Sequence, residues 1–367
     1  MKYIILISAF FIAISSKAQD CNEESLLQTP GIWNESSGST SGIVVTDLTR
    51  EKKVVATITA MIKSKYTPIG VSARLNGRYD RSESYMPVNS YSCNITPLNF
   101  YCDGKMIKTA DETSTSFHIS VNVFDVDIYD TAQGDRSMAE GFNVMHGLPV
   151  EKDGYWYFKE KDANLGFGMK GKNCAWLITY DGKLPFAYVT KKEFLKKRKK
   201  ILENEMLMTA ASFKESLKSI EMEKGFKETE YKNDPEKLKK YMEMSYQYTK
   251  DKFEKLLANN EKNYKPEFDK IETQLKMSAE ELNQQAIVRL DPNANLSSYL
   301  FTDDNDPFRE VLIKPNPGYF NNKLPKSSPQ FFWIDIVWNH NEPIATKFRE
   351  EIMKAVDFAA LKNMLGK

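Results

Sequence analysis

Residues 174–182 read Cys174-Ala175-Trp176-Leu177-Ile178-Thr179-Tyr180-Asp181-Gly182. The first seven are apolar, aromatic or β-branched residues, which favour a strand that is at least half buried. The Asp-Gly pair that follows readily takes the left-handed backbone angles of a type I′ turn. The stretch therefore predicts a β-hairpin whose second strand returns through Phe186 and Tyr188.

The same strand-and-turn signature extends toward the N-terminus, back to residue 71. Asn-Gly or Asp-Gly pairs recur at residues 76–77, 103–104 and 153–154. Residues 117–123 alternate apolar and polar side chains, with His118 at a polar position, as in a half-buried strand. Residues 48–64 instead have apolar side chains at near-helical spacing. We expect an antiparallel sheet with this early helix packed on one face.

The chain changes period at Thr190. Thr190 and Glu193 form a capping box, and only one glycine, Gly225, occurs between residues 191 and 285. A narrow apolar stripe precedes a stop-and-restart at Asp234-Pro235, where aspartate caps a new helix and proline takes its first position. Pro266 is expected to kink or restart the return arm. Residues 190–285 therefore predict a long, highly charged helical hairpin of the coiled-coil type.

The remaining residues, 286–367, predict a C-terminal α/β segment that packs on the rest of the protein. Residues 331–338 are almost wholly apolar, which indicates a strand covered on both faces, although Asp335 interrupts the run and must be paired or at an edge. Pro343 opens a terminal helix. The fold class is therefore α+β, with a helix-plus-sheet domain over residues 19–189 between an N-terminal segment and the hairpin.

The N-terminal segment, residues 1–18, has the three parts of an export signal. Lys2 is followed by the uncharged run Ile4–Ile14 and by small residues before a cut between Ala18 and Gln19. The run of 11 residues is shorter than the roughly 20 that a spanning helix needs. Asp20 directly before Cys21 argues against lipid attachment to that cysteine. We expect a soluble protein in the periplasm or outside the cell.

Composition excludes several function classes. Lys and Arg number 51 against 50 Asp and Glu, so the chain lacks the basic footprint of a nucleic-acid-binding protein. Only three histidines occur, and none has the spacing of a metal-binding motif. No P-loop, dinucleotide fingerprint or serine-hydrolase elbow is present, and no cofactor is predicted.

The four cysteines contain no C-x-x-C pair, and an exported chain can keep disulfides. We predict a Cys93–Cys102 disulfide, because a tight turn centred on Pro97-Leu98 would set the two cysteines opposite each other. Four unpaired thiols are the alternative.

Two acidic groups are candidates for chemistry. Asp125 and Asp127 would share one strand face, and paired carboxylates are what a glycosidase uses as acid and base or nucleophile. A solvated strand face explains them equally simply.

The second group has oxygen side chains at alternate positions, as calcium prefers. Its would-be loop has Leu296 and Thr302 where the EF-hand pattern needs glycine and glutamate, and turn formation is the alternative explanation. Its members are Asp291, Asn293, Asn295, Asp303, Asp304 and Asp306.

Three stretches resemble a set of exported bacterial proteins whose activity is not characterised. They are Pro30-Gly31-Ile32-Trp33, residues 65–71 (Lys-Tyr-Thr-Pro-Ile-Gly-Val), and residues 314–320 (Lys-Pro-Asn-Pro-Gly-Tyr-Phe) with Leu324-Pro325. The resemblance implies that the three segments of the mature chain belong to one architecture, and it implies no activity, ligand or catalytic residue.

Two hypotheses about function follow. The first is a non-enzymatic envelope protein that binds a partner or ligand, with residues 191–285 as docking arm or spacer. The lysine-rich start of the hairpin, residues 191–200, is either a solvated face or a contact for an anionic envelope surface. The second is an envelope hydrolase that acts on glycan or peptide through Asp125 and Asp127.

Overall fold

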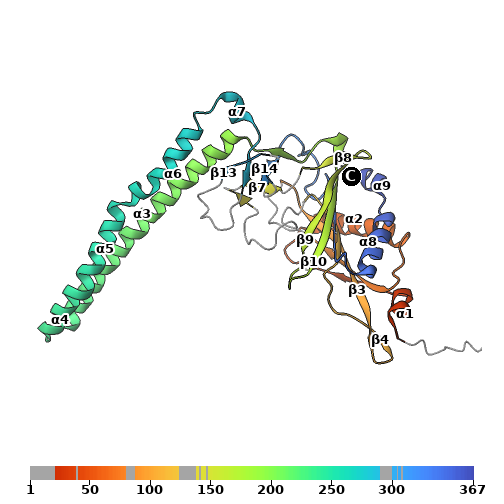
Figure 1. The fold of residues 1–367 in the computed structure, drawn as a ribbon, viewed down its shortest axis with the longest axis horizontal. Helices are drawn as coiled ribbons and strands as arrows, with labels where there is room; N and C mark the ends of the chain where they lie inside the picture. Colours follow the sequence, from red (N-terminus) through yellow and green to blue (C-terminus); the bar gives the residue numbers. More distant parts are fainter. Residues whose placement is uncertain are drawn as a thin grey trace, which may run out of the picture. The chain divides into compact units, whose positions relative to one another are not determined.

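The computed structural model describes residues 21–38, 40–79, 87–123, 138–139, 142–145, 148–289, 300–303, 305–306 and 309–367. It confirms the α+β class (Figure 1). The chain divides into two compact units, each made of several segments. The first contains residues 1–125, 149–185 and 317–367, and the second contains residues 126–148 and 186–316.

A nine-stranded sheet forms the first unit, in the order β1-β2-β3-β5-β15-β10-β9-β8, with β4 paired to the end of β3. Neighbouring strands are antiparallel, except that β1 and β2 are parallel. The strands are β1 (Trp33–Ser37), β2 (Val71–Arg78), β3 (Tyr91–Asp103), β4 (Met106–Thr109), β5 (Ser116–Val121), β8 (Val150–Lys152), β9 (Tyr155–Asn164), β10 (Lys170–Ile178) and β15 (Phe332–Trp338).

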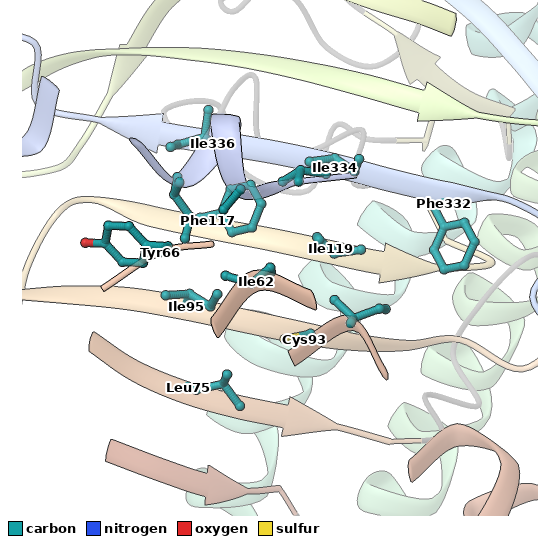
Figure 2. Close-up of a cluster of buried hydrophobic side chains, with 14 of the residues drawn as sticks. Ile62, Tyr66, Leu75, Cys93, Ile95, Phe117, Ile119, Phe332, Ile334 and Ile336 are labelled. Carbon is teal, nitrogen blue, oxygen red and sulfur yellow. The ribbon is translucent and has the colours of Figure 1, made fainter. Parts of the chain in front are cut away.

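Helices α2 (Val45–Lys63) and α8 (Pro343–Ala355) cover one face of this sheet, as the sequence predicts for the early helix. Ile58 and Ile62 of α2 and Phe348 of α8 are buried in one cluster with the inward side chains of the central strands. Figure 2 shows Ile62 among the side chains of these strands. The short helices α1 (Glu23–Gln28) and α9 (Phe358–Lys362) complete the unit. Burial of this apolar face is the main source of stability here.

Strand β15 lies between β5 and β10 and pairs with both. Asn122, directly after β5, ties down the loop that leads into β15. Its side chain donates to the carbonyls of Asn89 and Ser328 (3.0 and 2.9 Å), and it accepts from the backbone nitrogens of Gln330 and Phe331 (2.7 and 3.4 Å). Asn122 is fully buried and has φ +60°, a left-handed conformation that asparagine tolerates better than most residues.

The second unit contains a six-stranded sheet in the order β13-β12-β14-β7-β6, with β11 paired to β14. Its strands are β6 (Met138–Ala139), β7 (Phe142–Met145), β11 (Phe186–Tyr188), β12 (Ile287–Arg289), β13 (Leu300–Phe301) and β14 (Arg309–Pro315). Val189, Phe194, Leu195 and Leu202 are buried with Leu312 of β14, so the base of the hairpin is part of this unit's core.

The predicted helical hairpin is present. Helix α3 (Lys191–Glu230) begins at the Thr190–Glu193 capping box and has 40 residues. The return arm consists of α4 (Pro235–Tyr241), the π-helical turn η3 (Met242–Tyr246), α5 (Gln247–Ala258) and α6 (Asn260–Gln274), followed by α7 (Ala279–Asn283). Asp234 caps α4 and Pro235 is its first residue, as expected. Helix α6 continues through Pro266, and the break in the arm lies at Asn259 instead.

Two of the four predicted hairpins are confirmed and two are wrong. Asp103-Gly104 and Asp153-Gly154 connect β3 to β4 and β8 to β9. Asp181-Gly182 takes the predicted left-handed angles, but β11 pairs with β14 because both edges of β10 are already occupied by β9 and β15. Asn76-Gly77 lies inside β2, where a Cβ on Gly77 would come within 2.6 Å of the Tyr79 hydroxyl.

The Cys93–Cys102 prediction is wrong, because β3 runs without a turn through Pro97. The N–H of Ala73, which lies opposite Pro97, donates to Ile32 on the β1 side. The backbone nitrogen of Pro97, which has no hydrogen to donate, therefore faces the other edge of β3. Pairing of that edge with β5 ends at Ile95, so no ladder hydrogen bond is lost there. The nine residue steps from Cys93 to Cys102 along this extended strand span about 30 Å, far beyond disulfide reach.

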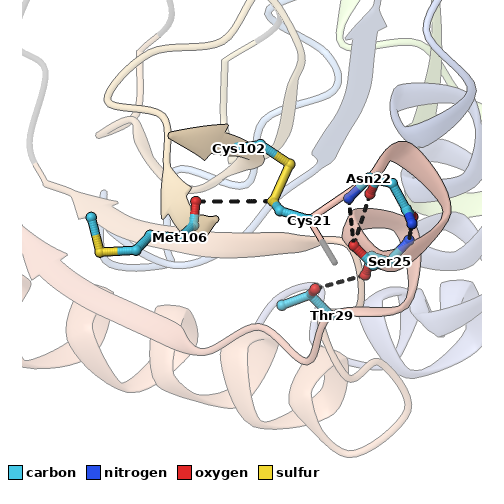
Figure 3. Close-up of a disulfide and its surroundings, with 6 residues drawn as sticks. All are labelled: Cys21, Asn22, Ser25, Thr29, Cys102 and Met106. Atoms are coloured by element: carbon cyan, nitrogen blue, oxygen red, sulfur yellow. Dashed lines mark hydrogen bonds between the residues drawn. A yellow bond between two sulfur atoms is a disulfide. The ribbon is translucent and has the colours of Figure 1, made fainter. Parts of the chain in front are cut away.

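Cys102 instead forms a disulfide with Cys21, with 5.7 Å between their Cα atoms (Figure 3). The Sγ atom of Cys21 also lies 3.9 Å from the carbonyl oxygen of Met106. Because this sulfur belongs to the disulfide, it has no hydrogen to donate to that oxygen. Beside it, Asn22 and Ser25 form a capping box that starts α1. The bridge therefore fixes the first described residues to the β3–β4 hairpin. Cys93 and Cys174 are free and buried.

The unit boundaries differ from the expected domain organisation. Residues 286–316 supply β12, β13 and β14 to the second unit, whereas residues 317–367 supply β15, α8 and α9 to the first. The predicted C-terminal segment, residues 286–367, is therefore shared between the units. Among the residues that the structure describes, no helix is both long and apolar enough to cross a membrane.

Denatured, unreduced protein is expected to show two reactive thiols. Burial raises the pKa of Cys93 and of Cys174 to about 11, so in the folded protein both thiols react slowly at pH 8.

Cys21→Ser is expected to lower the free energy of unfolding by about 2–4 kcal/mol, since the bridge closes a loop with a sequence separation of 81. The combined Cys21→Ser/Cys102→Ser variant should cost no more, and a count of four thiols in unreduced protein would contradict the pairing.

Asn122→Ala is expected to lower the free energy of unfolding by about 3 kcal/mol or more, because buried backbone groups lose their partners. Asn122→Gly removes the same hydrogen bonds but relieves the left-handed backbone, so it should be milder by about 1 kcal/mol. Urea unfolding of both variants checks this. Equal stability of Asn122→Ala and the wild type would show that the loop before β15 is held by other contacts.

Candidate functional site

Most of the site residues proposed from sequence lie outside the described residues. This is the case for Asp125 and Asp127, for the calcium candidates Asp291, Asn293, Asn295 and Asp304, and for the signal-cleavage residues Ala18 and Gln19.

Two of the calcium candidates, Asp303 and Asp306, are described, and both act in a turn. Asp303 Oδ1 accepts from the backbone nitrogen of Asn305 at 2.8 Å, and Asp306 Oδ2 accepts from the Thr302 hydroxyl at 2.8 Å. Asp306 also faces Arg289 at 3.8 Å. These contacts favour the turn-forming alternative. The described part of the chain contains no group of three or more His, Cys, Asp or Glu that could hold a metal ion.

The described residues with the most unusual chemistry lie on the face of the first unit's sheet opposite α2 and α8. Side chains alternate between the faces of a strand, so Ile334 and Ile336 enter the core while Asp335 points the other way. The cross-strand register then places Asn76, Asn94, His118 and Asp335 side by side on β2, β3, β5 and β15. We call these four residues the polar row.

His118 and Asp335 form the centre of the polar row. The imidazole Nδ1 lies 2.9 Å from Asp335 Oδ2; the carboxylate is only 2% exposed and the imidazole is 28% exposed. Strand alternation in the sequence assigns each of these residues to one face of its own strand, whereas only the register of β5 against β15 brings the two together across 217 residues. Within the described residues, the second oxygen of Asp335 and the amide oxygen of Asn76 are buried without a hydrogen-bond partner.

A buried carboxylate that holds one ring nitrogen of a more exposed histidine fixes the orientation and tautomer of the imidazole. This is the relation between the acid and the base of a catalytic triad, and also a common way to support a histidine that binds a polar ligand. Ser116 and Ser120 lie two residues to either side of His118 on the same strand face. The polar row is therefore the candidate site of the first unit.

The inner face of the hairpin is closed by its own polar and aromatic contacts. The Asn260 amide, which is buried beside the break in the return arm, donates to the Met206 carbonyl at 2.9 Å. Thr209 and Tyr264 are joined by a hydroxyl–hydroxyl bond of 3.0 Å. Nearer the tip, Glu221 accepts from Tyr246 at 2.7 Å and from Lys250 at 2.8 Å, and these bonds lower the pKa of Glu221. The two arms therefore have a fixed register.

The outer face of α3, which points away from the return arm, is exposed and partly apolar. Leu207, Met208, Met222 and Phe226 are 63%, 73%, 53% and 75% exposed. Five exposed lysines share this face of the helix: Lys196, Lys197, Lys200, Lys214 and Lys218. Two exposed acidic residues lie among them, Glu203 and Glu215, and Glu215 is paired with Lys218 at 3.6 Å. The return arm has its own exposed pair, Met244 and Tyr248, at 68% and 70%.

Comparisons of this chain with protein-family models, with curated proteins and with solved structures found no match.

Asp335→Ala is expected to lower the free energy of unfolding by about 2–4 kcal/mol, because it removes the buried carboxylate that contacts His118 and opens a small cavity. Asp335→Asn keeps the shape and one acceptor, so it should cost about 1 kcal/mol. Asp162→Ala, which removes an 87% exposed carboxylate on the same sheet, is the control and should change stability by less than about 0.5 kcal/mol. Urea unfolding that ranks Asp335→Ala with the control would contradict a structural His118–Asp335 pair.

Proposed function

We propose that this protein is exported and acts as a non-enzymatic binding protein of the cell envelope, with the helical hairpin as its docking arm. The observation that supports this function is the outer face of α3, where four large apolar side chains are more than half exposed. Exposed apolar groups grouped on one face mark interaction surfaces more often than scattered single residues do.

The structure of the hairpin separates docking from folding. Its inner face holds the two arms in register through Asn260, Tyr264 and Tyr246, and its base is buried with β14. Leu207, Met208, Met222 and Phe226 take no part in either set of contacts and are exposed. Their side chains are therefore available to a partner at little cost in stability. The export signal predicted from the sequence of residues 1–18 supports a location in the envelope.

A hydrolase that acts on envelope glycan or peptide is the second candidate, and the His118–Asp335 pair is the observation that favours it. In such an enzyme His118 would serve as general base, with Asp125 and Asp127 as further carboxylates. The test measures hydrolysis of peptidoglycan and of casein by the purified wild type and by two variants, His118→Ala and Asp125→Ala/Asp127→Ala. Activity that is lost in a folded variant supports the enzyme, and the absence of activity in the wild type excludes these two substrates.

The docking function is tested by retention of the tagged mature chain, residues 19–367, on its native envelope fraction. Met222→Ser/Phe226→Ser is expected to reduce retention at least about tenfold, because two exposed apolar anchors are lost. Met244→Ser/Tyr248→Ser is the matched control, since it removes one methionine and one aromatic residue of similar exposure from the return arm. Equal retention of the wild type and the α3 variant would refute the docking arm.

Substitution is preferable to deletion of the hairpin. Removal of residues 191–285 would also remove Phe194, Leu195, Leu202 and Leu282 from the core of the second unit. Loss of retention would then report unfolding rather than loss of a docking face.

A further inference from the structure

We propose that the outer face of α3 docks on the surface of an anionic lipid bilayer. This inference rests on the proposed docking function and names the chemistry of the partner. It depends on two properties that occur together on this face, exposed apolar side chains and an excess of positive charge.

Positive charge is in excess on this face. Its five lysines, Lys196, Lys197, Lys200, Lys214 and Lys218, are all exposed, and the acidic residues among them are two, Glu203 and Glu215. The rest of the hairpin is different: on the return arm, Lys265 pairs with Asp269 and Lys270 with Glu267, so positive and negative groups alternate there. A surface with this excess of lysine attracts an anionic partner and repels a second copy of itself.

The apolar side chains distinguish a bilayer from other anionic partners. Leu207 and Met208 lie near the middle of α3, and Met222 and Phe226 lie toward its tip. A nucleic acid or a free polyanion offers mainly phosphate or sulfate to this face and leaves these groups in water. A bilayer accepts both kinds of side chain, because apolar groups enter the boundary between headgroups and acyl chains while lysines extend their ammonium groups to the phosphates.

The geometry of α3 suits such a contact. At 1.5 Å per residue, the thirty residues from Lys196 to Phe226 span about 45 Å, so the lysines and apolar groups would lie along the membrane plane. The return arm packs on the opposite side of α3, through Phe213 with Phe253 and Thr209 with Tyr264. The lipid-facing side chains are therefore presented by a braced helix, which does not need to fold when it binds.

The test is cosedimentation of the mature chain with vesicles of phosphatidylcholine and phosphatidylglycerol (3:1), compared with pure phosphatidylcholine. Binding is expected to the anionic vesicles only, and to fall steeply between 0.1 and 0.5 M salt, as screening of charged contacts requires. Replacement of the five face lysines by glutamine should weaken binding about a hundredfold or more. Met222→Ser/Phe226→Ser should weaken it about tenfold.

A matched lysine variant separates the face from net charge. Lys252, Lys255, Lys262, Lys265 and Lys276 are exposed on the return arm, and their replacement by glutamine removes the same five charges. This variant should bind anionic vesicles nearly as well as the wild type. Circular dichroism establishes that each variant is folded.

Several results would overturn the proposal. They are equal losses in the two lysine variants, equal binding to neutral vesicles, and binding to heparin but not to vesicles. If vesicles do not bind but the envelope fraction still retains the protein through Met222 and Phe226, the lipid inference fails and the docking function stands. If neither binds, both fail.

Discussion

The insertion of β15 between β5 and β10 is the constraint on which the first unit depends. Residues 332–338 pair along both edges, and they connect strands β1, β2, β3 and β5 with β8, β9 and β10. Asn122 and Tyr91 hold the loop that leads into β15, through hydrogen bonds to backbone groups of residues 327–331. Because the central strand comes from the end of the chain, the sheet is completed only when distant segments meet, which is typical of slow, non-local folding.

The two faces of that sheet have different physical roles. The face under α2 and α8 is apolar and supplies the burial that stabilises the unit. The opposite face contains Asn76, Asn94, His118 and Asp335, and burial of such groups costs free energy unless they are paired. Valine at these four positions would pack against the neighbouring strands without the free-energy cost of burying polar groups. Packing therefore does not explain the polar row.

The hairpin divides its two tasks between opposite sides of one helix. Hydrogen bonds of Asn260, Thr209 and Glu221 set the register of the arms. A hydrogen bond is directional and forms only in one register, whereas apolar contacts between two helices also form after one helix shifts along the other. The outer side carries lysines and large apolar groups without such partners on the return arm. Docking through this side would leave the fold unchanged, because no buried contact has to break.

Local chemistry in the sequence determined the elements, and tertiary structure determined how they combine. The capping box at Thr190, the Asp234-Pro235 restart and the alternation around His118 depend on neighbours in the chain, so the sequence predicts them correctly. Pairing depends on which strand edges are still free. The exit of β11 to β14, the Cys21–Cys102 bridge and the His118–Asp335 contact are all such cases, and each joins segments that local spacing cannot relate.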